Sequence, residues 1–126
     1  MIRFFLVSGA MLAGLSVAFG AFATHALRAK LDDRALSIFE TGARYQMYHA
    51  IALILIALFM SRVELSETLL TTSGIAFISG IILFSGSLYA LSLSGVKILG
   101  AVAPLGGAGF LIGWACFAIA AFQWKP

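Results

Sequence analysis

The chain has 126 residues, of which 62% are hydrophobic and 10% are charged, and its net charge is +3. Its mean hydropathy is +1.07, whereas a soluble domain averages roughly 25% charged residues. So few charges cannot cover a water-facing surface, so the composition indicates one integral membrane domain over residues 1–126. No basic stripe exists to neutralise phosphates, which argues against a nucleic-acid partner.

The first apolar segment covers residues 4–24 and follows Arg3. It ends in Ala21-Phe22-Ala23, which resembles the cleavage site of a signal peptide. However, it runs for about 20 residues, beyond the roughly 7–15 residues of a signal-peptide core. We therefore expect a transmembrane helix.

The connection that follows, LDDRALSIFETGARY, has the period of an amphipathic helix. Apolar residues recur every four positions, at Leu31, Ala35, Phe39 and Ala43. Asp32 is a plausible N-cap, and Gly42 is a plausible stop after the last turn. We expect a short interfacial helix over residues 33–41. The alternative is one continuous helix that enters the membrane without a break at Gly42.

Three further apolar runs cover residues 44–60, 69–93 and 98–123. Each is close to the roughly 17–25 residues that span a bilayer. The stretches between them, SRVELSET and SLSGVK, are short, so successive helices should run antiparallel. The predicted fold is an all-α membrane protein, an antiparallel bundle of four transmembrane helices with a short amphipathic interfacial helix between the first two.

Small residues recur at four-residue spacing on the first and fourth segments. They are Ala10, Gly14 and Ala18; Ser16, Gly20 and Thr24; and Gly109 and Gly113. In lipid, small residues allow the close backbone approach on which helix association depends. The pattern predicts tight helix packing and leaves open whether the partner is internal or another protomer.

Polar and helix-bending residues gather in one half of the expected bundle. We call the end that holds the first connection the A end and the opposite end the B end. The candidate ligand-binding residues are His25, Arg44, Tyr45, Gln46, Tyr48, His49, Ser85, Ser87, Tyr89, Pro104 and Gly106. They predict either a pocket for a lipid or small molecule or a polar network that only locks the bundle.

Spacing assigns roles to some of these residues. Arg44 and Tyr48 are four apart, as are Tyr45 and His49, so each pair shares a helix face. Arg44 is the expected partner of an anionic headgroup or a carbonyl. Pro104 removes a backbone donor, so a kink or an open carbonyl is expected early in the fourth helix.

The sequence offers little support for catalysis or a cofactor. His25 and His49 are the only histidines, and they fall at different depths, which argues against haem ligation by both without removing it as an alternative. No metal-binding, phosphate-binding or nucleophile motif is present. We expect no cofactor and no enzyme activity, and we expect Cys116 to be a packing residue.

Four motifs in order resemble one family of small membrane proteins. They read AFGAFATHAL, RYQMYHAIAL, LFSGSLYALSLSG and APLGGAGFLIGW. Together they resemble the YgdD-like family, also called transmembrane protein 256-like, a domain of unknown function (423). The resemblance implies four transmembrane helices and a multi-pass protein of the bacterial plasma (inner) membrane. It supplies no catalytic residues.

Function is therefore predicted only in outline. The first hypothesis is a membrane protein that binds a membrane lipid or small molecule near the A end. The first alternative is an accessory or assembly subunit of a larger membrane complex, and the second is a haem- or quinone-binding redox protein. The expected protein partners are other copies of the chain, in a homo-oligomer, or subunits of such a complex. Cations favour the A end by five to three, which leans toward a cytoplasmic A end. They are Arg28, Lys30, Arg34, Arg44 and Lys97 against Arg3, Arg62 and Lys125.

Overall fold

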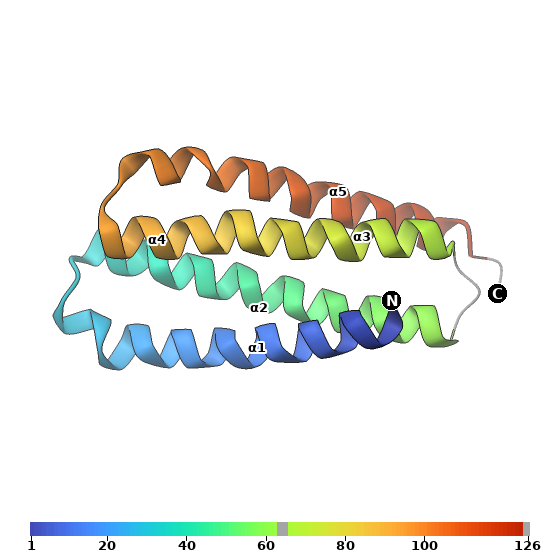
Figure 1. The fold of residues 1–126 in the computed structure, drawn as a ribbon, viewed down its shortest axis with the longest axis horizontal. Helices are drawn as coiled ribbons and strands as arrows, with labels where there is room; N and C mark the ends of the chain where they lie inside the picture. The colour runs from blue at the N-terminus through green and yellow to red at the C-terminus, as the bar shows by residue number, and fades with distance from the viewer. Residues whose placement is uncertain (63–65, 125–126) are drawn as a thin grey trace.

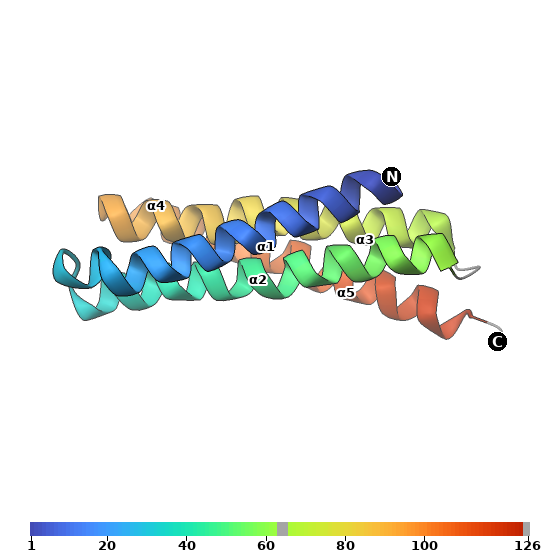
Figure 2. The ribbon, with the colours of Figure 1, turned by 90° about the horizontal axis from the view of Figure 1, so that it is seen from below.

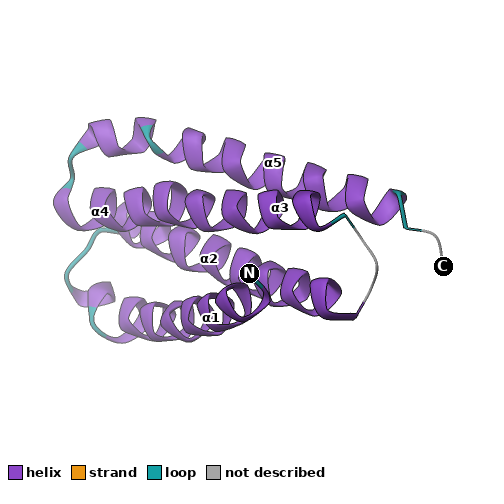
Figure 3. Cartoon of the chain, turned by 45° about the vertical axis from the view of Figure 1, so that its right-hand side comes forward, coloured by secondary structure: helices purple, strands orange, loops and turns teal. Residues whose placement is uncertain are grey.

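The structure, a computed structural model, describes residues 1–62 and 66–124. Four continuous helical segments are long and apolar enough to cross a membrane: Ile2–Ala29, Asp33–Arg62, Glu67–Ser94 and Lys97–Phe122. Successive segments run antiparallel, and the turns at the A end join the first pair and the last pair (Figures 1 and 3). The predicted four-helix membrane fold is confirmed. Residues 63–65 of the second connection and Lys125 lie outside the described residues.

The helical segments divide into eight elements. They are α1 (Ile2–His25), the 3-10 turn η1 (Leu27–Ala29), α2 (Asp33–Arg62), α3 (Glu67–Gly80), the π-helical turn η2 (Ile81–Ser85), α4 (Gly86–Ser94), the 3-10 turn η3 (Lys97–Ala101) and α5 (Ala103–Phe122). The helix α1 packs mainly along α2, α2 packs on α3, η2 and α4, and α5 packs on α3 and η2. The four segments therefore pack in the order α1, α2, α3–α4, α5, so that α1 and α5 lie on the two outer sides of the bundle (Figures 1 and 2).

The predicted break at Gly42 is wrong, because α2 continues without interruption from Asp33 to Arg62. Asp32 does cap the helix, since its Oδ1 accepts the Ala35 N–H at 2.7 Å. The apolar stripe of the connection continues in register into the membrane segment through Phe39, Ala43 and Gln46, which are all buried. One helix keeps all of these residues on the same inward face.

The third segment contains a π-helical turn between α3 and α4. Ser66 caps its start by accepting the Leu69 N–H, and Gly95 ends it in the left-handed conformation with φ of 71°. The extra residue of a π turn rotates the side chains that follow it relative to those before it. Such turns recur at functional sites, and this one places Phe84 and Ser85 toward α5 and α2.

Pro104 starts α5 rather than bending it. It stands in the first helical turn, where its missing N–H leaves no bond unmade. The irregular backbone lies before it, in the 3-10 turn η3. Gly106 is buried against Phe84, so it permits close packing and does not open the helix. The kink predicted within the fourth helix is therefore replaced by a change of helix type at its start.

Phenylalanine rings packed against glycines hold the helices of the core together. A Cβ on Gly113 of α5 would lie 2.5 Å from the Phe77 ring, and one on Gly80 would lie 2.5 Å from the Phe110 ring. Phe5 of α1 packs in the same way against Gly74. These close approaches are the dispersion contacts that lipid, being equally apolar, leaves as a main source of helix association.

The small residues divide into an inward set and an outward set. Gly109 and Gly113 of α5 face the bundle and pack on α3. Ala10, Gly14 and Ala18 of α1 are exposed, and nothing lies within 4 Å of a Cβ placed on Gly14. Tight internal packing thus explains the stripe of α5 but not the first stripe of α1.

Candidate functional site

Buried hydroxyl and amide groups bind backbone carbonyls across the helix interfaces. Ser16 of α1 donates to the Ala43 carbonyl at 2.6 Å. Ser85 of η2 donates to the Gly42 carbonyl at 2.7 Å. Ser92 of α4 donates to the Ala35 carbonyl at 2.6 Å. These acceptors already belong to the hydrogen-bond ladder of α2, so the bonds connect α1 and two elements of the third segment, η2 and α4, to α2 without breaking it.

Gln46 and Tyr89 extend this network through the middle of the bundle. The Tyr89 hydroxyl donates to Gln46 Oε1 at 2.8 Å. Gln46 Nε2 donates in turn to the Leu12 carbonyl of α1 at 2.8 Å. Within the described part of the chain, no buried side-chain nitrogen or oxygen lacks a partner. These two candidates therefore have the geometry of the predicted locking network.

Both ring nitrogens of His49 are engaged. Nδ1 lies 2.7 Å from the Tyr45 carbonyl, and Nε2 lies 3.1 Å from the indole nitrogen of Trp114, which is a donor only. His49 must therefore accept at Nε2 and donate from Nδ1, which assigns one neutral tautomer. The ring also stacks on Phe110, with centroids 3.5 Å apart and planes 4° apart.

A groove of about 690 Å³ lies between α2, η2 and α5. Its lining residues are aromatic, aliphatic or small, and none carries a formal charge, since His49 is in its neutral tautomer. They are Tyr45, Tyr48, His49, Phe84, Pro104, Gly107, Ala108, Phe110, Leu111 and Trp114. Gly107 and Ala108 have small side chains, so α5 does not cover the groove, which is open toward the outer surface of the bundle.

Two phenols provide the polar groups of this groove. Tyr45 is 38% exposed and Tyr48 is 53% exposed. Their rings meet edge to face, with centroids 5.8 Å apart. Among residues 1–62 and 66–124, neither hydroxyl takes part in a hydrogen bond, so both are available to a ligand.

The continuous α2 changes the expected depth of this site. Counted from residue 44, His49 would lie about 7 Å inside the membrane segment, whereas counted from Asp33 it lies about 24 Å along the helix. The helix has 30 residues, or about 45 Å at the α-helical rise. The groove therefore lies near the middle of the bundle rather than at its A end.

The remaining candidate residues lie elsewhere. Arg44 lines a second hollow of about 400 Å³ between α1 and α2, opposite Thr24 and beside Glu40. His25 is exposed in the last turn of α1. Ser87 donates to the Phe84 carbonyl of its own segment at 2.9 Å. The structure thus brings Tyr45, Tyr48, His49 and Pro104 together at the groove. Arg44 does not line the groove but shares the second hollow with Tyr48, and His25 lines neither space.

Several residues of the site carried no recognisable signal in the sequence. Phe84, Phe110 and Trp114 form much of the groove wall, but an aromatic residue in an apolar segment does not indicate which neighbour it faces. Ser73 donates to the Gly113 carbonyl at 2.7 Å and was not among the polar residues predicted to gather in one half of the bundle. A search for isolated serines on apolar helices would have found Ser73 and Ser92.

The two histidines do not line the groove together. His49 lines the groove, and His25 does not. Within the described residues, no group of three or more His, Cys, Asp or Glu side chains could hold a metal ion. This arrangement does not provide the paired axial ligation that a haem held by both histidines requires.

Comparisons with known proteins give one consistent result. Residues 19–107 match the family model described as a protein of unknown function, DUF423. The chain is 41% identical over 122 residues to the UPF0382 membrane protein YwdK of Bacillus subtilis, covering 97% of this chain and 98% of that protein. It is 40% identical over 121 residues to a UPF0382 membrane protein of Staphylococcus aureus, covering 96% and 97% of the two chains. No solved structure matches the chain.

Proposed function

The chain belongs to the DUF423 family of membrane proteins of unknown function, and we propose that it binds a neutral, lipid-like molecule in the groove between α2 and α5. The observation that carries the proposal is the groove itself, which is lined by aromatic rings and has two phenol hydroxyls that form no hydrogen bond within residues 1–62 and 66–124. We further propose the bacterial plasma membrane as its location, since the relatives reported above are bacterial membrane proteins.

The walls of the groove favour an apolar and partly flat ligand. The stacked pair of His49 and Phe110 lines the groove, and Trp114 extends the aromatic surface. Aromatic side chains prefer offset or edge-to-face contacts, which suit a planar ring or a slender chain. The absence of a formal charge from the lining residues argues against an ionic ligand at this position.

The phenols favour a ligand that bears an acceptor oxygen. Tyr45 and Tyr48 can each donate one hydrogen bond, and both stand beside the groove on α2. The ester carbonyl of a lipid and the ring carbonyl of a quinone share this chemistry. We therefore assign the ligand to the class of apolar molecules with at least one carbonyl oxygen.

Native mass spectrometry of the protein in a mild detergent tests this proposal. The wild-type protein should carry a discrete adduct whose mass distinguishes a phospholipid from a quinone. Gly107→Leu should abolish the adduct, because a Cβ on Gly107 has room beside Phe84 and a longer side chain fills the groove. Arg44→Ala should keep it, since Arg44 faces the other hollow.

Gly86→Leu is the matched control. Gly86 is helical like Gly107, it is exposed, and nothing lies within 4 Å of a Cβ placed there. It should retain the adduct. A wild-type protein that carries no adduct even after reconstitution with bacterial lipids, or an adduct that survives Gly107→Leu, would contradict binding in the groove.

A second candidate function is an accessory subunit of a membrane complex. One observation favours it, namely the outward-facing stripe of Ala10, Gly14 and Ala18 on α1. In a subunit of this kind, Gly14→Leu would remove higher-mass assemblies from the native mass spectrum and Gly86→Leu would preserve them. A monomeric wild-type protein would count against this candidate.

A further inference from the structure

A second pocket at the A end has a chemistry unlike that of the groove. It has a volume of about 530 Å³ and lies between the first turns of α2, the end of α4 and η3. Two cations line it, Arg34 from α2 and Lys97 from η3. We propose that this pocket binds the phosphate group of an anionic membrane lipid, a site independent of the groove and of the proposed function.

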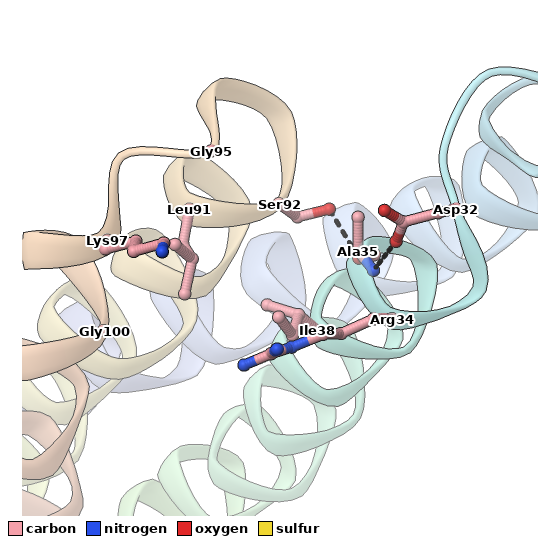
Figure 4. A pocket seen from close by; sticks show the side chains of 9 residues that line it. All are labelled: Asp32, Arg34, Ala35, Ile38, Leu91, Ser92, Gly95, Lys97 and Gly100. Carbon is pink, nitrogen blue, oxygen red and sulfur yellow. Dashed lines mark hydrogen bonds between the residues drawn. The ribbon is translucent and has the colours of Figure 1, made fainter.

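The two cations come from segments about 60 residues apart and face one space. In Figure 4 the guanidinium of Arg34 and the ammonium of Lys97 both point into the gap between α2 and the α4–α5 turn. Both side chains are exposed at the mouth of the pocket. Two cations on opposite sides of a gap can contact one phosphate from both directions, as Arg and Lys do in phosphate sites.

Neither cation is engaged by the other lining residues. The hydrogen bonds drawn in Figure 4 join Asp32 Oδ1 to the Ala35 N–H and the Ser92 hydroxyl to the Ala35 carbonyl. Asp32 is the acidic residue of the pocket, and its carboxylate caps α2. The start of α2 is thereby already occupied, so the binding groups for an anion are the two side chains.

The rest of the pocket suits a lipid rather than a bare ion. Ile38 of α2 and Leu91 of α4 are half-buried and line it one turn further from the A end. A phosphate held by the cations would place a glycerol and the first methylenes of an acyl chain against these aliphatic groups. Ser92 fixes the wall by binding the Ala35 carbonyl at 2.6 Å.

The pocket also lies at headgroup depth. The α2 helix has 30 residues, or about 45 Å, whereas the hydrocarbon core is about 30 Å thick. Its first turn therefore extends into the headgroup layer, where a basic side chain attracts anionic lipids most strongly. Asp32 and Asp33 precede Arg34 there and reduce the local positive charge, so the lysine from η3 is needed as well as the arginine.

The test is a titration of the detergent-solubilised protein with phosphatidylglycerol and, separately, phosphatidylcholine, followed by native mass spectrometry. Wild-type protein should retain one phosphatidylglycerol in preference to phosphatidylcholine. The double variant Arg34→Gln/Lys97→Gln should weaken that retention by roughly tenfold or more, since two cations near the surface are removed. Arg34→Lys/Lys97→Arg should restore it.

A matched variant separates a built site from general charge attraction. Arg28→Gln/Lys30→Gln removes two cations from the same end, and neither residue lines the pocket. It should retain phosphatidylglycerol as the wild type does. Equal loss in both double variants, or equal retention of the two lipids, would overturn the proposal. Displacement of the lipid by inorganic phosphate at millimolar concentration would instead assign the pocket to a soluble phosphate.

Discussion

The hydroxyls of Tyr89 and Tyr48 differ in what they contact. Tyr89 donates to Gln46 inside the bundle, whereas Tyr48 is 53% exposed beside the groove. Tyr89→Phe should lower the free energy of unfolding by about 1 kcal/mol, the scale of hydrogen bonds between membrane helices, and leave ligand retention intact. Tyr48→Phe should weaken ligand retention and leave the free energy of unfolding unchanged. Unfolding in mixed detergent micelles and the adduct signal measure the two effects, and variants with the same profile would contradict this division.

His49 supports Trp114 as well as lining the groove. His49→Phe keeps an aromatic ring against Phe110 but leaves the Trp114 N–H without its acceptor. An unpaired donor costs roughly 1–3 kcal/mol. We expect a loss of stability in that range and a change in the tryptophan fluorescence. His25→Phe at the exposed end of α1 is the control, and it should change neither quantity.

At the scale of single residues, the sequence identified the polar side of α2 but not how it divides. Tyr45 and His49 share a face because they are four residues apart, and both do line the groove. Arg44, only one residue before Tyr45, is turned by about 100° and lines the other hollow. The direction of each face depends on where α1 and α5 pack, which periodicity alone does not encode.

Among the elements, α2 shows why a helix stop cannot be read from a glycine alone. Gly42 was expected to end a short helix, but it lies mid-helix where the Tyr89 ring and the Ser85 carbonyl approach closely. The same residue type serves a turn in one context and a helix contact in another. The continuous spacing of Phe39, Ala43 and Gln46 was the better indicator, because burial selects the period of a whole face.

This contact predicts a penalty for a single methyl group. A Cβ at position 42 would lie 2.9 Å from Tyr89 Cε1. Gly42→Ala should therefore destabilise the protein by about 1–3 kcal/mol, as overpacking does. Gly86→Ala, which meets nothing within 4 Å, should be neutral or stabilising by up to about 1 kcal/mol. Thermal unfolding in detergent compares them, and equal midpoints would contradict close packing at Gly42.

In the whole molecule, the segments form a row in which the flanking helices α1 and α5 are less buried than α2. The number and direction of the spans followed from the apolar runs, since bilayer thickness fixes their length. The open groove did not follow from them, because it depends on α5 packing against α3 and η2 and leaving one side of α2 uncovered. The π turn that shapes this side has no sequence signature that we recognise.

An even number of spans places the N-terminus and the end of α5 toward the B end, opposite the turns at Lys30 and Val96 (Figure 1). Single cysteines introduced at Lys30 and Val96 in a Cys116→Ser background should react with a membrane-impermeant maleimide from one side. Cysteines at Ile2 and Trp124 should react from the other side. The A end carries five basic side chains against three at the B end, so we expect the A end to be cytoplasmic. The cysteines at Lys30 and Val96 should then react only after the membrane is permeabilised. Labelling of Lys30 and Val96 from opposite sides would contradict the fold, whereas labelling of both from outside would reverse only the orientation. In that case the phosphate pocket would face the outer leaflet, and its lipid would have to be drawn from there.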